Sequence, residues 1–413
     1  MSEYRSQVPP REMIDRQFEE LSDEPSFVKY RPSFLGNGEE QVVFDFEDHP
    51  DVVGKVPVYT MKKIMSGTCE LDQEIARDRL ANKELRHHFG RHALREYVGH
   101  QTVEVSEEIH DFMFSDNEEG DPPPDATSVD TLIRIQDKIP AEVLDGVNQD
   151  GASALFLESK LGLSLDDFRL FAGKLADGQG DIDRADMDRL MGARERNIAD
   201  LIGKDESFKA AVTDFVGRAM IYTKDTGKTL DIMGHGNLLY FIDGEKWDYL
   251  LVDAKDPWTG ALDFADNAME KLLAGEELER WEVSGISKQL SYASTLNMLA
   301  NLCGLPDRLE AFSFDLSELS DEELTDLRSV LSASEQKKMD GKIQGLWDHV
   351  QQRPEDVSMR GHLLQSLGYV GKDAPDPRID AILTEFVEYL DVNPDGSFED
   401  FHAMCTDVVS RLG

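Results

Sequence analysis

Cysteine, basic residues and long apolar runs are all scarce in this sequence. The chain has three cysteines among 413 residues, far apart, which predicts neither a disulfide framework nor a zinc ribbon. No run reaches the roughly eighteen apolar residues of a membrane span, and the N-terminus lacks the apolar segment of a signal peptide. We therefore expect a cytoplasmic protein that has no membrane partner.

Basic residues are outnumbered by acidic ones, with 43 lysines and arginines against 83 aspartates and glutamates and a formal net charge of −40. Nucleic acids bind basic patches, so this balance argues against a nucleic-acid partner. The acidic residues are spread along the whole chain. Such a distribution is typical of a halophilic, acidic proteome, in which salt screens the repulsion between carboxylates. An acidic protein of a low-salt cell is the alternative.

The most informative segment covers residues 231–253 and reads DIMGHGNLLYFIDGEKWDYLLVD. Its second half predicts a β-hairpin, because two apolar runs at 238–242 and 247–252 surround the turn dipeptide Asp243-Gly244. The hydrophobic content of the chain, 40%, supports a folded core around such elements.

Three polar residues surround this hairpin in the order carboxylate, amide, carboxylate: Asp231, Asn237 and Asp253. In kinase-type sites an Asp accepts the proton of the acceptor hydroxyl, while an Asn and a later Asp hold metal on the triphosphate. The segment resembles these loops of the protein-kinase-like superfamily, especially atypical small kinases similar to aminoglycoside phosphotransferases. The resemblance implies that Asp231 is catalytic and that Asn237 and Asp253 bind Mg²⁺.

The segment departs from the family pattern in three ways. Asp231 and Asn237 are six positions apart instead of the usual five, and Thr229 stands where the family has histidine. The Asp-Phe-Gly signature is reduced to Asp253-Ala254-Lys255. A pseudokinase, which keeps the fold without catalysis, is therefore the alternative.

A second block of the same resemblance lies upstream. Residues 34–38 read Phe-Leu-Gly-Asn-Gly, and two strand-like runs follow within 41–56. This order is similar to the kinase glycine loop, second strand and third strand with its lysine. It implies that Gly36 and Gly38 let the backbone approach the phosphates of ATP, and that Lys55 pairs with the α and β phosphates. A plain turn followed by a surface lysine is the other interpretation.

Three further elements are expected from such a fold. Residues 70–89 are rich in helix formers, and residues 129–139 alternate like a strand that leads to an adenine-binding linker. Glu84 is the expected partner of the lysine and Glu74 the second choice, with solvated helix charges as the alternative for each. Apolar spacing predicts a buried helix at 207–225, before the catalytic loop.

Most of the remaining chain is predicted to be helical. Residues 391–398 imitate the start of a calcium-binding EF-hand loop, but position twelve of that loop is His402, so a capped turn is favoured. The expected helices are 163–175, 184–197, 265–273, 287–302, 321–331, 334–351, 360–367, 380–390 and 398–412.

These patterns together predict an α+β fold with two kinase-like lobes, a small β-rich N-lobe and a helical C-lobe. The expected parts are an arm at 1–30, the N-lobe at 31–140, the C-lobe at 141–305 with a helical insertion at 149–206, and a helical extension at 306–413.

The expected function is phosphate transfer from ATP, with Mg²⁺, to a hydroxyl of a small molecule or a protein. A nucleotide-binding pseudokinase or interaction scaffold stays open beside it. We expect the C-terminal helices to offer a surface for a protein partner.

Overall fold

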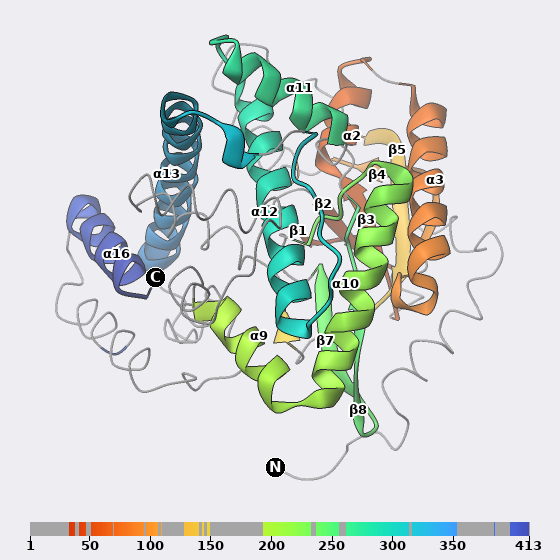
Figure 1. Ribbon diagram of the computed structural model, residues 1–413. Coiled ribbons are helices and arrows are strands. Elements are labelled where there is room, and N and C mark those ends of the chain that lie inside the picture. Colours follow the sequence, from red (N-terminus) through yellow and green to blue (C-terminus); the bar gives the residue numbers. More distant parts are fainter. Residues whose placement is uncertain are drawn as a thin grey trace. The chain divides into compact units, whose positions relative to one another are not determined.

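The chain forms two compact units, Met1–Val143 and Leu144–Gly413, in a computed structural model (Figure 1). Both units contain helices and antiparallel strands, so the fold is mixed α+β. The residues that the structure describes are 33–37, 41–46, 51–68, 70–94, 96–105, 109, 128–139, 143, 147–148, 193–232, 237–255, 262–313, 316–352, 384 and 397–412.

A five-stranded antiparallel sheet in the spatial order β1-β2-β3-β5-β4 forms the centre of the first unit. The predicted strands at 41–46, within 52–56 and at 129–139 are confirmed, whereas the first and fourth strands were not predicted. The five strands are β1 (Ser33–Asn37), β2 (Gln41–Asp45), β3 (Val52–Pro57), β4 (Glu96–Glu104) and β5 (Ser128–Asp137).

The two faces of this sheet pack against different helices, because side chains alternate along a strand. Met61 of α2 shares a core cluster with Ile133 of β5. On the opposite face, Ile75 of α3 packs against Leu132, the residue of β5 that precedes Ile133. The helical segments of this unit are α2 (Val58–Met65), α3 (Leu71–Phe89) and the short 3₁₀ helix η2 (Gly90–His92).

Helix α3 confirms the helix predicted at 70–89, since Glu70 is its N-cap residue. Helix α2 was not predicted. It is short and follows β3 directly, so its eight residues continued the strand-like run of the sequence.

The second unit combines a three-stranded sheet, in the order β6-β7-β8, with several helices. The strands are β6 (Val147–Asn148), β7 (Leu238–Asp243) and β8 (Lys246–Leu251). The helical segments are α9 (Ala193–Lys204), α10 (Glu206–Thr226), α11 (Leu262–Leu273), α12 (Arg280–Cys303), η4 (Leu316–Glu318), α13 (Asp321–Gln352) and α16 (Phe398–Leu412).

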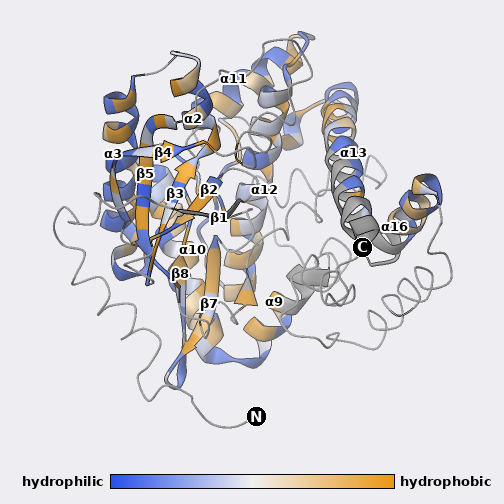
Figure 2. Ribbon diagram, turned by 180° about the vertical axis from the view of Figure 1, so that it is seen from behind, coloured by the Kyte–Doolittle hydropathy of each residue, from blue (hydrophilic) through white to orange (hydrophobic). Residues whose placement is uncertain are grey.

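The predicted hairpin and the predicted buried helix at 207–225 are both confirmed, and they pack on each other through aromatic rings. Phe208 and Phe215 of α10 contact Tyr240 and Tyr249 of the hairpin, with ring centroids 5.1 Å apart for Phe208–Tyr240 and 5.6 Å apart for Phe215–Tyr249. All four rings are buried. Strand β7 is mostly hydrophobic in colour, whereas α3 mixes both kinds of residue (Figure 2).

Three helix predictions were wrong in their boundaries. The helices expected at 321–331 and 334–351 are one helix, α13. Neither proline nor glycine stands between them, so nothing in the chain interrupts the backbone hydrogen bonds. Of the helix expected at 184–197, residues 184–192 lie outside the described residues, and α9 extends beyond the expected end to Lys204.

Three further predicted helices are found in the second unit. The helices predicted at 265–273, 287–302 and 398–412 correspond to α11, α12 and α16. The helices expected at 163–175, 360–367 and 380–390 lie outside the described residues, apart from residue 384. Within the described part of the chain, no helix has both the length and the apolar character that a membrane span requires.

Candidate functional site

The hairpin places the two predicted metal ligands, Asn237 and Asp253, at its open end. Leu238 pairs with Leu251 in the first register position of the two strands. Asn237 directly precedes the first of these residues, and Asp253 follows the second by two positions. The turn at the other end contains Gly244 with φ of 66°, a conformation that glycine adopts without steric cost.

Three hydrogen bonds join Asp231, Asn237 and the backbone on both sides of Asp253. The Asn237 side chain donates from Nδ2 to the Asp231 carbonyl oxygen at 2.9 Å. The Asp231 N–H donates to the carbonyl of Ala254, and the Val252 N–H donates to the carbonyl of Asn237, both at 2.9 Å. Hydrogen bonds therefore connect Asp231 and Asn237 with the two residues that flank Asp253.

The side chains of this group are suited to oxygen coordination of a cation. Because Nδ2 of Asn237 is used by Asp231, the amide presents Oδ1 as its remaining polar atom. Asp253 adds a carboxylate and is half-buried, as is Asn237. Mg²⁺ takes oxygen ligands from one or two carboxylates together with substrate phosphates and water, so these residues fit the ion.

The hairpin is attached to helix α10 by side-chain hydrogen bonds. Trp247 donates from Nε1 to Asp205 at 2.8 Å, and Asp205 also caps the first turn of α10 through the N–H groups of Ser207 and Phe208. Further along, the Tyr249 hydroxyl donates to Asp214 at 2.8 Å. Burial, followed by the Asp214 carboxylate, raises the pKa of Tyr249, so the phenol stays protonated.

The predicted phosphate-binding residues lie in one row across the sheet of the first unit. Gly36 pairs with Val43, Val43 pairs with Lys55, and Lys55 pairs with Arg134. Two strand spacings separate Gly36 from Lys55, which is about 10 Å. The register of β1 shifts between Phe34 and Gly36. Gly38 lies outside the described residues.

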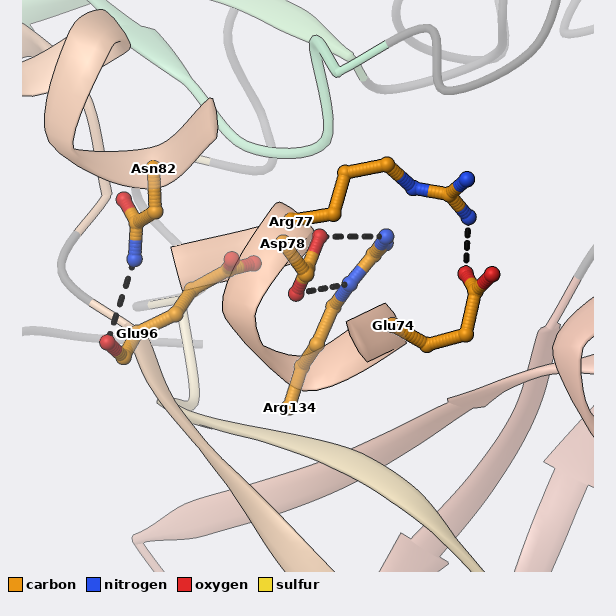
Figure 3. A network of polar contacts seen from close by, with 6 residues as sticks. All are labelled: Glu74, Arg77, Asp78, Asn82, Glu96 and Arg134. Carbon is orange, nitrogen blue, oxygen red and sulfur yellow. Dashed lines mark hydrogen bonds and ion pairs between the residues drawn. The ribbon is translucent and has the colours of Figure 1, made fainter. Parts of the chain in front are cut away.

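Helix α3 is joined to the sheet by a buried ion pair that the sequence did not indicate. Asp78 accepts two hydrogen bonds from Arg134 of β5, at 3.0 Å to Nε and 2.9 Å to Nη2. Glu74, the second choice as the partner of Lys55, forms an ion pair with Arg77 on the same helix (Figure 3). The pairing of Glu84 with Lys55 stays a prediction.

Arg134 and Gln136 are the residues of this region that sequence reasoning missed. Both are buried, at 4% and 2% exposure, and they stand two positions apart on the face of β5 that meets α3. The alternation at 129–139 predicts the strand, but it does not show that its polar residues are buried. The sequence signal for a buried polar group was the pair of polar residues two positions apart, on a strand expected to lie near the lysine-bearing strand.

The segment resembling a calcium loop is described only at its end. Residues 391–396 lie outside the described part, whereas Ser397 accepts the N–H of Asp400 and so caps α16. His402 contacts Asp340 of α13 at 2.8 Å. Among the described residues, no group of three or more histidine, cysteine, aspartate or glutamate side chains is arranged to hold a metal ion.

The chain was compared with protein-family models, with curated proteins and with solved structures, and none of the three comparisons finds a match.

Proposed function

We propose that the chain is an ATP- and Mg²⁺-dependent phosphotransferase of the kinase-like kind that acts on a hydroxyl of a small molecule or a protein. The observation that carries the proposal is the set of three hydrogen bonds connecting Asp231 and Asn237 to the residues beside Asp253. These bonds support the proposal because they connect the backbone at Asp231 and Asn237 with the two neighbours of Asp253. The fold supports it as well, since a β-rich unit with a lysine on its third strand precedes a largely helical unit.

The proposed reaction assigns one task to each residue. Asp231 orients the acceptor hydroxyl and takes its proton while the hydroxyl oxygen bonds to the γ-phosphorus and ADP departs. Asn237 and Asp253 hold Mg²⁺, which supplies positive charge against the phosphate oxygens when bound. Gly36 permits close approach of the backbone, and Lys55 pairs with the α and β phosphates.

A nucleotide-binding pseudokinase or scaffold is the second candidate. The longer spacing between Asp231 and Asn237 and the sequence Asp253-Ala254-Lys255 favour it. In this candidate the nucleotide and Mg²⁺ bind, but no acceptor is phosphorylated. In either case, the role of the C-terminal helices in binding a protein partner is part of the proposal.

Nucleotide binding is tested by the melting temperature of the native chain with ATP, with and without Mg²⁺, in high-salt buffer. A ligand that binds the native state raises the melting temperature, and a hundred-fold excess over Kd adds about 2.7 kcal/mol. We expect a Mg²⁺-dependent rise that both Lys55→Ala and Asp253→Asn abolish. The matched controls are Lys83→Ala and Asp326→Asn, which change exposed residues of the same types and are expected to keep the rise. No rise in the native chain contradicts the proposal.

The variant Asp231→Asn separates the two candidates. If the chain is an active enzyme, this variant binds ATP like the native chain but forms ADP at least about a hundred-fold more slowly, because general-base catalysis is lost. ADP formation is followed by chromatography with a panel of small alcohols and proteins as acceptors. Native-like nucleotide binding with equal, negligible ADP formation in both chains favours the pseudokinase.

A further inference from the structure

Gln136 of β5 is a buried neighbour of Lys55. It stands two positions after Arg134, which is the cross-strand partner of Lys55, so both β5 side chains lie on the face that carries Lys55. Its exposed fraction is 2%. With the amide oriented to satisfy its neighbours, Gln136 accepts a hydrogen bond from Nζ of Lys55 at 3.3 Å and donates one to Oε1 of Glu96 at 3.2 Å.

The chemistry of the two neighbours fixes the orientation of this amide. An ammonium group only donates hydrogen bonds, and an ionised carboxylate only accepts them. The amide oxygen therefore faces Lys55, and the amide nitrogen faces Glu96. A residue without both a donor and an acceptor at position 136 cannot make this pair of bonds.

The same group of residues is connected to helix α3. Asn82 of α3 donates from Nδ2 to the carbonyl oxygen of Glu96 at 3.1 Å, and the Asp78–Arg134 ion pair lies beside it (Figure 3). Lys55 is thus linked through Gln136, Glu96 and Asn82 to a helix that packs on the sheet. We call the three residues Gln136, Glu96 and Asn82 the relay.

We propose that Gln136 is a positioning residue that holds the ammonium group of Lys55 ready for the nucleotide phosphates, an inference that rests on the function proposed above. A lysine has a flexible four-carbon stem, and immobilising it on binding costs conformational entropy. The bond to Gln136 restricts the stem before the nucleotide arrives. An ammonium group has three N–H donors, and this bond uses one of them.

Two readouts on the full chain test this role: the affinity for ATP with Mg²⁺, and the rate at which an amine-acylating reagent modifies Lys55, followed by mass spectrometry. The variant Gln136→Leu removes both hydrogen bonds and keeps a side chain of similar size. The control Gln101→Leu makes the same change on β4, where the glutamine donates to the carbonyl of Thr102. We expect Gln136→Leu, but not Gln101→Leu, to weaken ATP binding about ten-fold, which corresponds to one hydrogen bond to a charged group. We also expect the reagent to acylate Lys55 faster in Gln136→Leu.

The double variant Gln136→Glu with Glu96→Gln exchanges the amide and the carboxylate of the relay. The new carboxylate at position 136 accepts from Lys55 and from the new amide at position 96. We expect an affinity within about three-fold of native, because the number of hydrogen bonds is unchanged. If circular dichroism shows that Gln136→Leu does not fold, the double variant is the test of the proposal. Native-like acylation of Lys55 in the double variant supports the proposal, and faster acylation overturns it.

The outcomes separate this inference from the proposed function. If the native chain binds no ATP, the proposed function fails and the readiness of Lys55 for phosphates fails with it. Acylation then tests only whether Gln136 restrains Lys55: faster modification of Lys55 in Gln136→Leu than in Gln101→Leu supports the restraint, and equal rates overturn it. If the native chain binds ATP, both readouts must change in Gln136→Leu. A loss of affinity without faster acylation indicates a general packing role and overturns the positioning role.

Discussion

At the scale of single residues, the Asp78–Arg134 pair has the largest expected effect on stability. The side chains are only 9% and 5% exposed, and both nitrogens of the guanidinium edge are used. Bringing two charges out of water is costly, so such a pair adds little net stability compared with apolar residues. Removing one partner is different, because a buried charge is then left without its counter-ion.

We therefore expect Asp78→Asn to lower the free energy of unfolding by about 3 kcal/mol or more, within the range for breaking a buried pair. Urea unfolding followed by circular dichroism measures it, since urea leaves ionic strength unchanged. The control is Asp200→Asn, which breaks the exposed pair with Lys204 and is expected to cost at most about 1 kcal/mol. Equal losses in the two variants contradict the prediction.

A double replacement tests the physical explanation. Asp78→Leu with Arg134→Met removes both charges at once, and it is expected to be more stable than Asp78→Asn, because no charge remains buried without a partner.

At the scale of elements, the start of α10 holds the hairpin that carries Asn237 and Asp253. Asp205 accepts two backbone N–H groups of the first turn and the indole N–H of Trp247. The hydrogen bond from Phe208, followed by that from Trp247, lowers the pKa of Asp205 below its ordinary value of 3.8. These bonds favour the ionised carboxylate in the folded chain.

The sign of the pH effect follows from this lowered pKa. The stabilisation is complete above the unfolded value near 3.8 and is lost as the pH falls through the lower folded value. We expect the urea midpoint of the native chain to exceed that of Asp205→Ser by a constant margin at neutral pH, and by less as the pH approaches 3. Serine keeps a capping oxygen but cannot titrate there. A margin that stays constant down to pH 3 contradicts the prediction.

At the scale of the whole molecule, charge dominates. A net charge of −40 on 413 residues creates repulsion between carboxylates that compaction increases. Salt screens this repulsion, since the Debye length falls from about 10 Å at 0.1 M to about 3 Å at 1 M.

We expect the melting temperature to rise with KCl between 0.1 M and 2 M and to level off once screening is complete. The variant that combines Glu270→Gln, Glu277→Gln and Asp326→Asn removes three exposed charges. It is expected to melt higher than the native chain at 0.1 M and to gain less from added salt. A melting temperature that does not depend on KCl in either chain contradicts the role of self-repulsion.

The elements themselves could largely be predicted from the sequence. The hairpin turn at Gly244, the strand β5 and the helices α3, α10 and α16 follow from patterns that repeat within a few residues. Such patterns depend on local backbone preference and on which side of an element is apolar. The fourth strand, β4, was missed because its residues do not alternate regularly between buried and exposed, and because Gly99 inside it weakens the strand signal.

The sequence by itself determined the charge, the order of most elements and the three polar residues around the hairpin. Only the tertiary structure decided how polar groups pair: the hydrogen bond of Asn237 to the Asp231 carbonyl, the ion pair of Asp78 with Arg134, and the bond of Gln136 to Lys55. The ion-paired residues are 56 positions apart. Periodicity reports the face on which a residue lies, whereas a hydrogen-bond partner depends on strand register and helix packing, which distant parts of the chain set together.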